Sequence, residues 1–348
     1  MGGSQYHPIS RRRLMHGAAA SLLPLGYYSY LHAATPATAA ETLAQDYGLV
    51  RLNGNTWTSA TEIRLRETLA ELPKLKESIV VAERELDERI EQNRRDWQDT
   101  VPLRKTMQVA LSKLSPGDPQ RTALRQKLDE LARASSDPMH LAGRSEVRAK
   151  LVNLVRDRSA LTLALLGLRS ALAEMQPGYA DLAANAAVKQ ALQRLGGQQR
   201  LGPLKNYEAD LKRLGEYERL VFTQSLPIYE QSGQIRMTAI VNESFPLTFT
   251  WLDASEQPTV LTAGAFDTLG ETLPADAPRK SLAFPAGRKQ TAREIVLPYI
   301  RFGRCVLSGV TAFVLPAEGE DLGSRLGRAA FAEHRVRIEP ERLRMTID

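Results

Sequence analysis

The chain has 348 residues, of which 43% are hydrophobic and 25% are charged, a composition typical of a folded protein with room for two domains. Its formal net charge is +6, but three of the positive charges are the consecutive arginines Arg11, Arg12 and Arg13. The remaining excess of positive charge is too small to indicate a nucleic-acid partner. A single cysteine, Cys305, excludes an intramolecular disulfide and a thiolate metal cluster.

Residues 1–40 have the layout of an export signal. The basic cluster at 10–15, SRRRLM, resembles the twin-arginine motif, and a moderately apolar run and then small residues follow it. Cleavage is expected after Ala33 or Ala39, while Pro24 disfavours the alternative of an uncleaved membrane anchor. We therefore expect an exported protein of the periplasm or cell envelope, held at a membrane only if the signal is not cleaved.

Residues 58–221 carry a helical pattern. Apolar residues recur at steps of three and four between charged ones, which places an apolar stripe on one face of each helix and a solvated surface opposite. Proline- and glycine-containing breaks at 115–119, 135–138 and 176–179 divide the pattern into successive helices. We therefore predict a helical bundle or coiled-coil hairpin, preceded by a linker over residues 41–57.

The chain offers few groups for metal or cofactor chemistry. Of its five histidines only His140 and His334 follow the predicted signal, and their separation in the sequence argues against a histidine-rich metal site. No G-x-S-x-G motif supports a Ser–His–acid triad. Cys305 lies in an apolar, strand-like run and is interpreted as a packed residue. We therefore predict no metal and no cofactor.

From about residue 222 the period of the pattern changes from that of helices to that of strands. Apolar and polar residues alternate within 233–242 and again within 246–252, on either side of a short turn. Further strand-like runs, separated by glycines and prolines, lie at 280–284, 294–302, 305–315 and 334–339. Residues 222–348 are therefore predicted to form a small, mostly β domain, and the whole chain an α + β protein of two domains.

Several short motifs follow one another in this β half. They are Thr259-Val260-Leu261-Thr262 six residues after Asp253, then Leu269-Gly270, a hairpin-like stretch around Gly287, VTAFVLP at 310–316 and LGRAAFAEHRVRIEPERLRMTI at 326–347. In order and spacing these motifs resemble the retropepsin-like aspartic proteases, single-lobe relatives of pepsin that work as dimers. The resemblance covers Leu226 to Asp348, over a third of the chain.

The resemblance implies a fold and a set of site residues. It implies an all-β acid-protease fold in which Asp253 is catalytic and Ala286 and Gly287 form the tip of a flap that contacts the substrate. In aspartic proteases two carboxylates about 3 Å apart share one proton, and they act as base on a water and as donor to the substrate carbonyl. Because a single-lobe domain supplies one such carboxylate, a homodimer is implied. The eye-catching aspartate of FDTLG, Asp267, falls on a helix and is interpreted as a solvated position.

The predicted catalytic loop departs from the D-T-G pattern of the family. Ala254 has no hydroxyl where the family has threonine, Ser255 has a side chain where the family has glycine, and Glu256 adds a negative charge beside the carboxylate pair. Arg325 replaces an apolar residue in the segment expected to pack behind the loop. A rearranged loop in which Ser255 takes the hydroxyl role is the alternative. Together these departures favour a degenerate site.

Two functions therefore stay open, and both take a protein or peptide as the partner. The first is an aspartic-type endopeptidase, active as a homodimer with Asp253 from each subunit. The second is a catalytically inactive retropepsin-like domain that acts as a binding or scaffold module, with the helical region as its partner-binding part. A third interpretation makes the helices the functional element and the β domain a structural cap.

Overall fold

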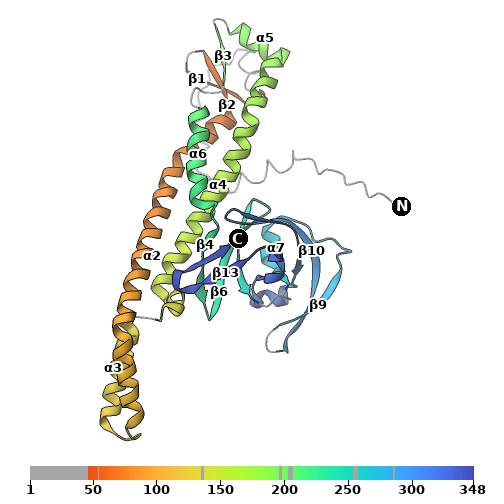
Figure 1. Ribbon diagram of the computed structural model, residues 1–348. Coiled ribbons are helices and arrows are strands. Elements are labelled where there is room, and N and C mark those ends of the chain that lie inside the picture. The colour runs from red at the N-terminus through yellow and green to blue at the C-terminus, as the bar shows by residue number, and fades with distance from the viewer. Residues whose placement is uncertain are drawn as a thin grey trace, which may run out of the picture. The chain divides into compact units, whose positions relative to one another are not determined.

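A computed structural model describes residues 46–53, 55–134, 137–195, 198–202, 207–253, 258–284 and 287–348. The fold is mixed α + β, with long helices in the N-terminal half and sheets in the C-terminal part, as predicted (Figure 1). The chain divides into two compact units, Met1–Pro73 with Leu163–Tyr217, and Lys74–Thr162 with Glu218–Asp348. The predicted export signal and its cleavage sites lie outside the described residues.

The first unit contains a small sheet, and its first strand and the start of its second lie in the stretch that the sequence assigned to a linker. Its strands lie in the order β1 (Leu49–Asn53), β2 (Thr56–Ser59) and β3 (Arg200–Leu201). In the sequence, β3 lies between helices α5 (Ala186–Arg194) and α6 (Tyr207–Val221). Leu49 and Trp57 are buried against Val188 of α5. The second half of the predicted linker is therefore ordered structure, because its apolar side chains pack against residues that are distant in the sequence.

Helix α4 (Ser145–Ala184) runs through Pro177, where the sequence predicted a break. A proline inside a helix removes one backbone hydrogen bond and crowds the preceding turn. Within the first unit, Tyr179 fastens this part of the helix, because its hydroxyl donates to Oε2 of Glu62 at 2.6 Å and accepts from the backbone N–H of Ser59 at 2.8 Å. The predicted break at 176–179 was wrong, since these tertiary hydrogen bonds outweigh the local signal.

In the second unit the helices follow the other two predicted breaks. Helix α2 (Ala60–Lys113), which begins in the first unit, ends before the first break, and α3 (Pro119–Ala134) then starts with a proline at a position that tolerates its missing N–H. The 3₁₀ helix η2 (Pro138–Gly143) follows the second break, and the side chain of Asp137 caps it. Among the described helices, none is both long and apolar enough to cross a bilayer.

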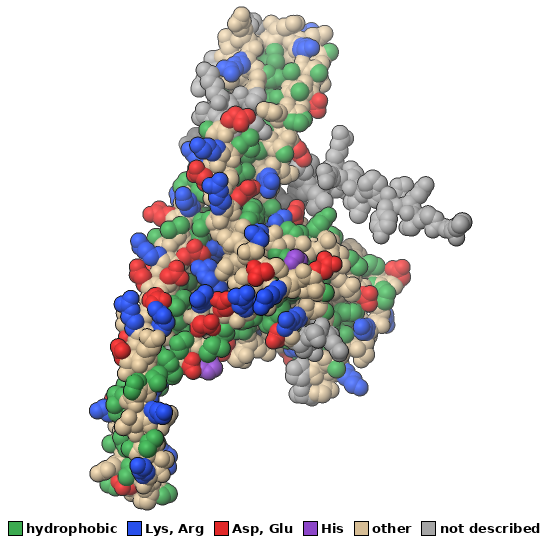
Figure 2. Space-filling view, in the orientation of Figure 1, with side chains coloured by type: hydrophobic (Ala, Val, Ile, Leu, Met, Phe, Trp, Pro, Cys, Tyr) green, Lys and Arg blue, Asp and Glu red, His purple; other side chains and the backbone are tan. Residues whose placement is uncertain are grey.

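Exposed ion pairs link α2 and α4 within the second unit. Nζ of Lys150 lies 2.6 Å from Oε2 of Glu85, and Nη2 of Arg89 lies 3.0 Å from Oε1 of Glu146. Figure 2 shows basic and acidic side chains mingled along the helices. Surface pairs of this kind contribute little to stability, so these charges mainly keep the helix surfaces solvated, as the sequence predicted.

Two sheets form the β part of the second unit. The larger has the order β5-β6-β7-β12-β8-β11-β10-β9, and the smaller has the order β13-β14-β4. The strands of the larger sheet are β5 (Tyr229–Gln231), β6 (Gln234–Val241), β7 (Phe245–Leu252), β8 (Thr259–Leu261), β9 (Arg279–Ala283), β10 (Lys289–Phe302), β11 (Cys305–Val314) and β12 (Arg325–Gly327). Those of the smaller sheet are β4 (Ser225–Pro227), β13 (Val336–Glu339) and β14 (Arg344–Ile347). The strand-like runs of the sequence are thus confirmed.

The large sheet curls on itself around an aromatic core. Strand β10 pairs with β6 as well as with β9 and β11, which brings distant strands of the sheet together. The rings of Phe302 and Phe331 pack inside with their centroids 5.2 Å apart, and that of Trp251 packs on Phe331 at 5.7 Å. Because Trp251 is the penultimate residue of β7, this core fixes the end of β7, directly before Asp253.

Short helices connect the strands. They are α7 (Ala263–Thr268), η4 (Ala317–Leu322), η5 (Arg328–Phe331) and η6 (Pro340–Arg342). Asp267 lies on α7 with its side chain exposed, so the interpretation of FDTLG as a solvated helical segment is confirmed. The hydroxyl of Thr262 caps α7 by accepting from the backbone N–H of Ala265 at 3.2 Å.

Candidate peptide-binding site

Asp253 follows β7 at the place where three strands meet. Strand β12 lies between β7 and β8, parallel to the first and antiparallel to the second. Gly327, the last residue of β12, pairs with Leu252, the last residue of β7, so the chain leaves both strands at the same level. Asp253 and Arg328 are the next residues along these two segments, and the register therefore brings their side chains together.

Asp253 and Arg328 form an exposed ion pair. Nη1 of Arg328 lies 3.1 Å from Oδ1 of Asp253, and the two side chains are 49% and 76% exposed respectively. A pair this exposed contributes about 0–1 kcal/mol, so a competing group can displace the arginine at little cost. The predicted departures at Ala254, Ser255 and Glu256 lie outside the described residues.

Strands β9 and β10 form the hairpin that the sequence predicted as a flap. Gly287 lies at its turn, exposed and with a φ of +71°, a conformation that favours glycine, whereas Ala286 lies outside the described residues. The backbone N–H of Phe284 donates to the carbonyl oxygen of Arg288 at 2.8 Å and closes the turn. Nη2 of Arg288 also donates to Oδ1 of Asp321 in η4 at 3.1 Å. That the hairpin contacts a ligand stays a prediction.

Arg325 of β12 is a buried arginine beside this hairpin, with only 8% of its surface exposed. Its guanidinium carbon lies 5.0 Å from the ring centroid of Phe284, and its Nε donates to the carbonyl oxygen of Leu322 at 3.1 Å. Burial lowers the pKa of Arg325 from its ordinary value, and the positive charges of Arg236 and Arg288 lower it further. The hairpin therefore packs on β12, the neighbour of β7.

Two other residues in this region, Arg236 and Thr250, were not predicted from the sequence. Thr250 of β7 pairs with Arg236 of β6 on one side and with Arg325 of β12 on the other. The register between strands that are distant in the sequence leaves no local pattern, so no motif marks this row of residues.

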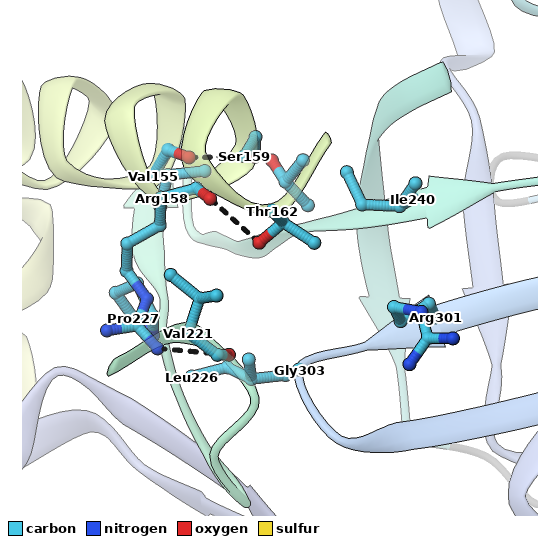
Figure 3. Close-up of a pocket in the computed structure, with 11 residues that line it drawn as sticks. Val155, Arg158, Ser159, Thr162, Val221, Leu226, Pro227, Ile240, Arg301 and Gly303 are labelled. Carbon is cyan, nitrogen blue, oxygen red and sulfur yellow. Dashed lines mark hydrogen bonds between the residues drawn. The ribbon is translucent and has the colours of Figure 1, made fainter. Parts of the chain in front are cut away.

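A cavity of about 40 Å³ in the second unit is a second candidate (Figure 3). Its lining includes Arg158 of α4 and Arg301 of β10. Arg158 donates to Oε1 of Glu83 at 2.7 Å and to Oγ1 of Thr223 at 3.1 Å, so its charge is already satisfied. The space suits a few water molecules and is too small for a peptide or a cofactor.

Cys305 and His334 form a third candidate, with Sγ and Nε2 3.7 Å apart. Burial raises the pKa of the Cys305 thiol, which opposes the thiolate that a nucleophilic cysteine needs. The sequence-based interpretation of Cys305 as a packed residue agrees with its burial. In the described part of the chain, no group of three or more His, Cys, Asp and Glu side chains is arranged to hold a metal ion.

Comparisons with known proteins give no more than a distant structural likeness. No protein-family model matches the chain, and no curated protein matches it. Among solved structures, the chain is similar to a crystal structure of a retropepsin-like aspartic protease from Rickettsia conorii, with 17% sequence identity and a TM-score of 0.28, over 35% of this chain and 88% of that chain. At this identity and score, the likeness assigns neither a family nor an activity.

Proposed function

We propose that the sheet part of the second unit is a retropepsin-like domain that binds an extended peptide beside Asp253. The observation that carries this proposal is the exposed carboxylate of Asp253 at the junction of β7, β8 and β12, next to a glycine-turned hairpin whose turn packs on β12 through Phe284. An exposed carboxylate and a nearby hairpin supply the polar contact and the cover that an extended ligand needs. The order of sequence motifs from Thr259 to the C-terminal strands supports the same assignment.

The ion pair at Asp253 favours a domain that binds peptides without cleaving them. Aspartic protease chemistry needs two carboxylates close enough to share a proton, so one of them is neutral. Asp253 is instead paired with Arg328, and an arginine is always charged and is the natural partner of an ionised carboxylate. The second carboxylate of a protease of this type would have to come from a partner subunit. A binding module needs no such pair.

Proteolysis by a homodimer is the second candidate, and the exposure of Asp253 favours it. The carboxylate of a partner subunit could approach Asp253 only if that side chain is accessible, as its 76% exposure allows. The ion pair with Arg328 contributes too little to prevent the rearrangement. Under this candidate, Asp253 from each subunit forms the dyad, and the hairpin at Gly287 covers the substrate.

The two candidates separate in one set of measurements on the purified full chain. Labelled degenerate octapeptides are tested for binding by fluorescence anisotropy and for cleavage between pH 3 and 7, with Asp253→Asn in parallel. Binding without cleavage supports the module, whereas cleavage that Asp253→Asn abolishes supports the peptidase. The absence of binding and of cleavage would remove both. Arg304→Gln, at the β10–β11 turn, is the control for a general effect of charge.

Sedimentation and cell fractionation test the two remaining parts of the proposal. A homodimer is expected because the family resemblance implies one, and a monomer over the concentration range of the binding assay would refute it. Export to the periplasm or cell envelope is expected from residues 1–40. Replacement of Arg11, Arg12 and Arg13 by lysine should retain the protein in the cytoplasm, and unchanged export would contradict the twin-arginine assignment.

A further inference from the structure

Two arginines and a threonine form one row across the large sheet. Thr250 of β7 lies directly opposite Arg236 of β6 and directly opposite Arg325 of β12. Residues paired in this way on neighbouring strands point to the same face of a sheet, with their Cβ atoms roughly 5 Å apart. Arg236 and Arg325 therefore flank Thr250 on one face of the sheet.

Gly323 leaves room for the guanidinium group of Arg236. A Cβ atom on Gly323 would lie 3.6 Å from Nη1 of Arg236, which places that guanidinium group against the segment leading into β12. Gly323 has a φ of +69°, a conformation that other residues rarely adopt. The repulsion between the two arginines that contributes to the lowered pKa of Arg325 agrees with this proximity.

The row has polar groups without partners. Among the described residues, no carboxylate pairs with Arg325 or with Arg236. The charge of Arg325 is nevertheless buried, since only 8% of the residue is exposed. Nε of Arg236 and Oγ1 of Thr250 are buried and have no hydrogen-bond partner in the described part of the chain. Buried charges in proteins are normally paired, and buried polar atoms are normally hydrogen-bonded. Two cations and two polar atoms without hydrogen-bond partners thus lie on one face of the sheet, an arrangement that suits the binding of an anionic group.

We propose that Arg236, Thr250 and Arg325 bind the carboxylate side chain of an acidic residue in the peptide that the domain takes. The planar guanidinium fork matches a carboxylate in two-point geometry, and the hydroxyl of Thr250 adds a third donor. This inference rests on the proposed peptide binding and names its ligand class. It also assigns Arg325 a role in recognition, whereas the sequence analysis interpreted this residue only as a disruptive replacement.

The distance along the strands places the acidic residue near the centre of the bound peptide. Thr250 precedes Asp253 by three residues, so the two positions lie at most about 10 Å apart along the backbone. An extended peptide spans the same distance in three residues. The recognised acidic side chain therefore lies within about three residues of the peptide position that faces Asp253. The ring of Phe284 under Arg325 connects this position to the turn of the hairpin.

The test compares two peptide mixtures on the full chain. Both are labelled octapeptides, random at seven positions, with one central position fixed as glutamate or as its isosteric neutral counterpart, glutamine. At low ionic strength the protein is expected to bind the glutamate mixture about tenfold more tightly or better. In Arg325→Met the ratio of the two affinities should fall to about one. Arg279→Met, which removes an exposed arginine of β9, should leave the ratio unchanged.

The outcomes distinguish this inference from the proposed function. Equal binding of both mixtures by the unaltered protein, or an unchanged preference in Arg325→Met, would overturn the carboxylate site and leave peptide binding intact. Failure to bind either mixture would overturn both. Arg325→Met should fold and unfold at a higher temperature than the unaltered protein, because it removes a buried unpaired charge. If Arg325→Met does not fold, Arg236→Met replaces it in the test and should also lower the ratio of the two affinities. An unchanged ratio in Arg236→Met would then overturn the inference.

Discussion

Replacement of Glu83 by glutamine should destabilise the second unit more than replacement of its partner Arg158 by leucine. The side chain of Arg158 is 7% exposed and that of Glu83 is 21% exposed. Glu83→Gln leaves a buried guanidinium group without a carboxylate, at a cost of about 3–5 kcal/mol in the free energy of unfolding. Arg158→Leu leaves a partly solvated carboxylate that still has Arg344 at 4.0 Å, so the cost should be nearer about 2 kcal/mol.

The double variant isolates the interaction between the two side chains. If the pair is a buried unit, the double variant should lose about 2 kcal/mol less than the sum of the single variants. Thr223, a second acceptor for Arg158, donates its own hydroxyl to the carbonyl oxygen of Ser225 at 2.7 Å, so it keeps a partner in every variant. Urea unfolding followed by circular dichroism gives the free energies, and hydrogen exchange of residues 145–162 measures the second unit by itself.

An exposed pair on the same helix provides the control. Arg84 and Glu88 of α2 lie 3.9 Å apart and are 68% and 72% exposed. Arg84→Leu should change the free energy of unfolding by less than about 0.5 kcal/mol. A coupling energy between Arg158 and Glu83 that is also below about 0.5 kcal/mol would show that burial does not strengthen the pair, and would refute the reasoning.

Two further predictions concern a titration and a turn. Burial, and then the hydrogen bond to Glu62, raise the pKa of Tyr179 above its ordinary value of 10.0, so its contribution to stability is complete below that value and is lost as the pH rises beyond it. Tyr179→Phe should remove this alkaline loss from pH-dependent thermal unfolding, and its persistence would contradict the assignment. Gly303 has a φ of +53°, and a Cβ there would collide with the carbonyl oxygen of Thr223, so Gly303→Ala should cost at least about 2 kcal/mol. Gly309 has a φ of +63° and open space, and Gly309→Ala should cost about 1 kcal/mol; equal losses on urea unfolding would exclude the steric explanation.

Local signals account for the parts of the fold that the sequence predicted. The alternation in β6 and β7 and the proline at the start of α3 act within a few residues, and the structure places strands and a helix start there. The prediction failed where distant contacts decide the outcome. Pro177 remains inside α4 because Tyr179 is hydrogen-bonded to a segment more than a hundred residues earlier, and β1 forms because Leu49 packs on α5.

The candidate site likewise has one part that local sequence signals predicted and one part that they did not. Asp253 was chosen as the candidate carboxylate because it lies six residues before Thr259. The structure places it directly after β7, a strand end that such a short-range pattern can predict. Its partner Arg328 depends on the parallel pairing of β7 with β12, which joins segments 75 residues apart. Residue types at such separations do not reveal their register. A family motif can therefore indicate the carboxylate but not the cation that sets its charge environment.

Arg158 and Arg325 are both buried arginines, but they differ in the charges that surround them. They are similarly buried, at 6% and 8% exposure, and burial is the first cause of a lowered pKa in both. For Arg158 the charge of Glu83 opposes the effect of burial, so the cation is compensated within the chain. For Arg325 the neighbouring charges are those of Arg236 and Arg288, which add to it. Packing alone does not favour a cation under those conditions, because an apolar side chain of similar size would fill β12 at lower cost. Arg325 has a backbone carbonyl oxygen and the ring of Phe284 as partners but no carboxylate in the described part of the chain, and the proposed peptide carboxylate would supply the missing negative charge.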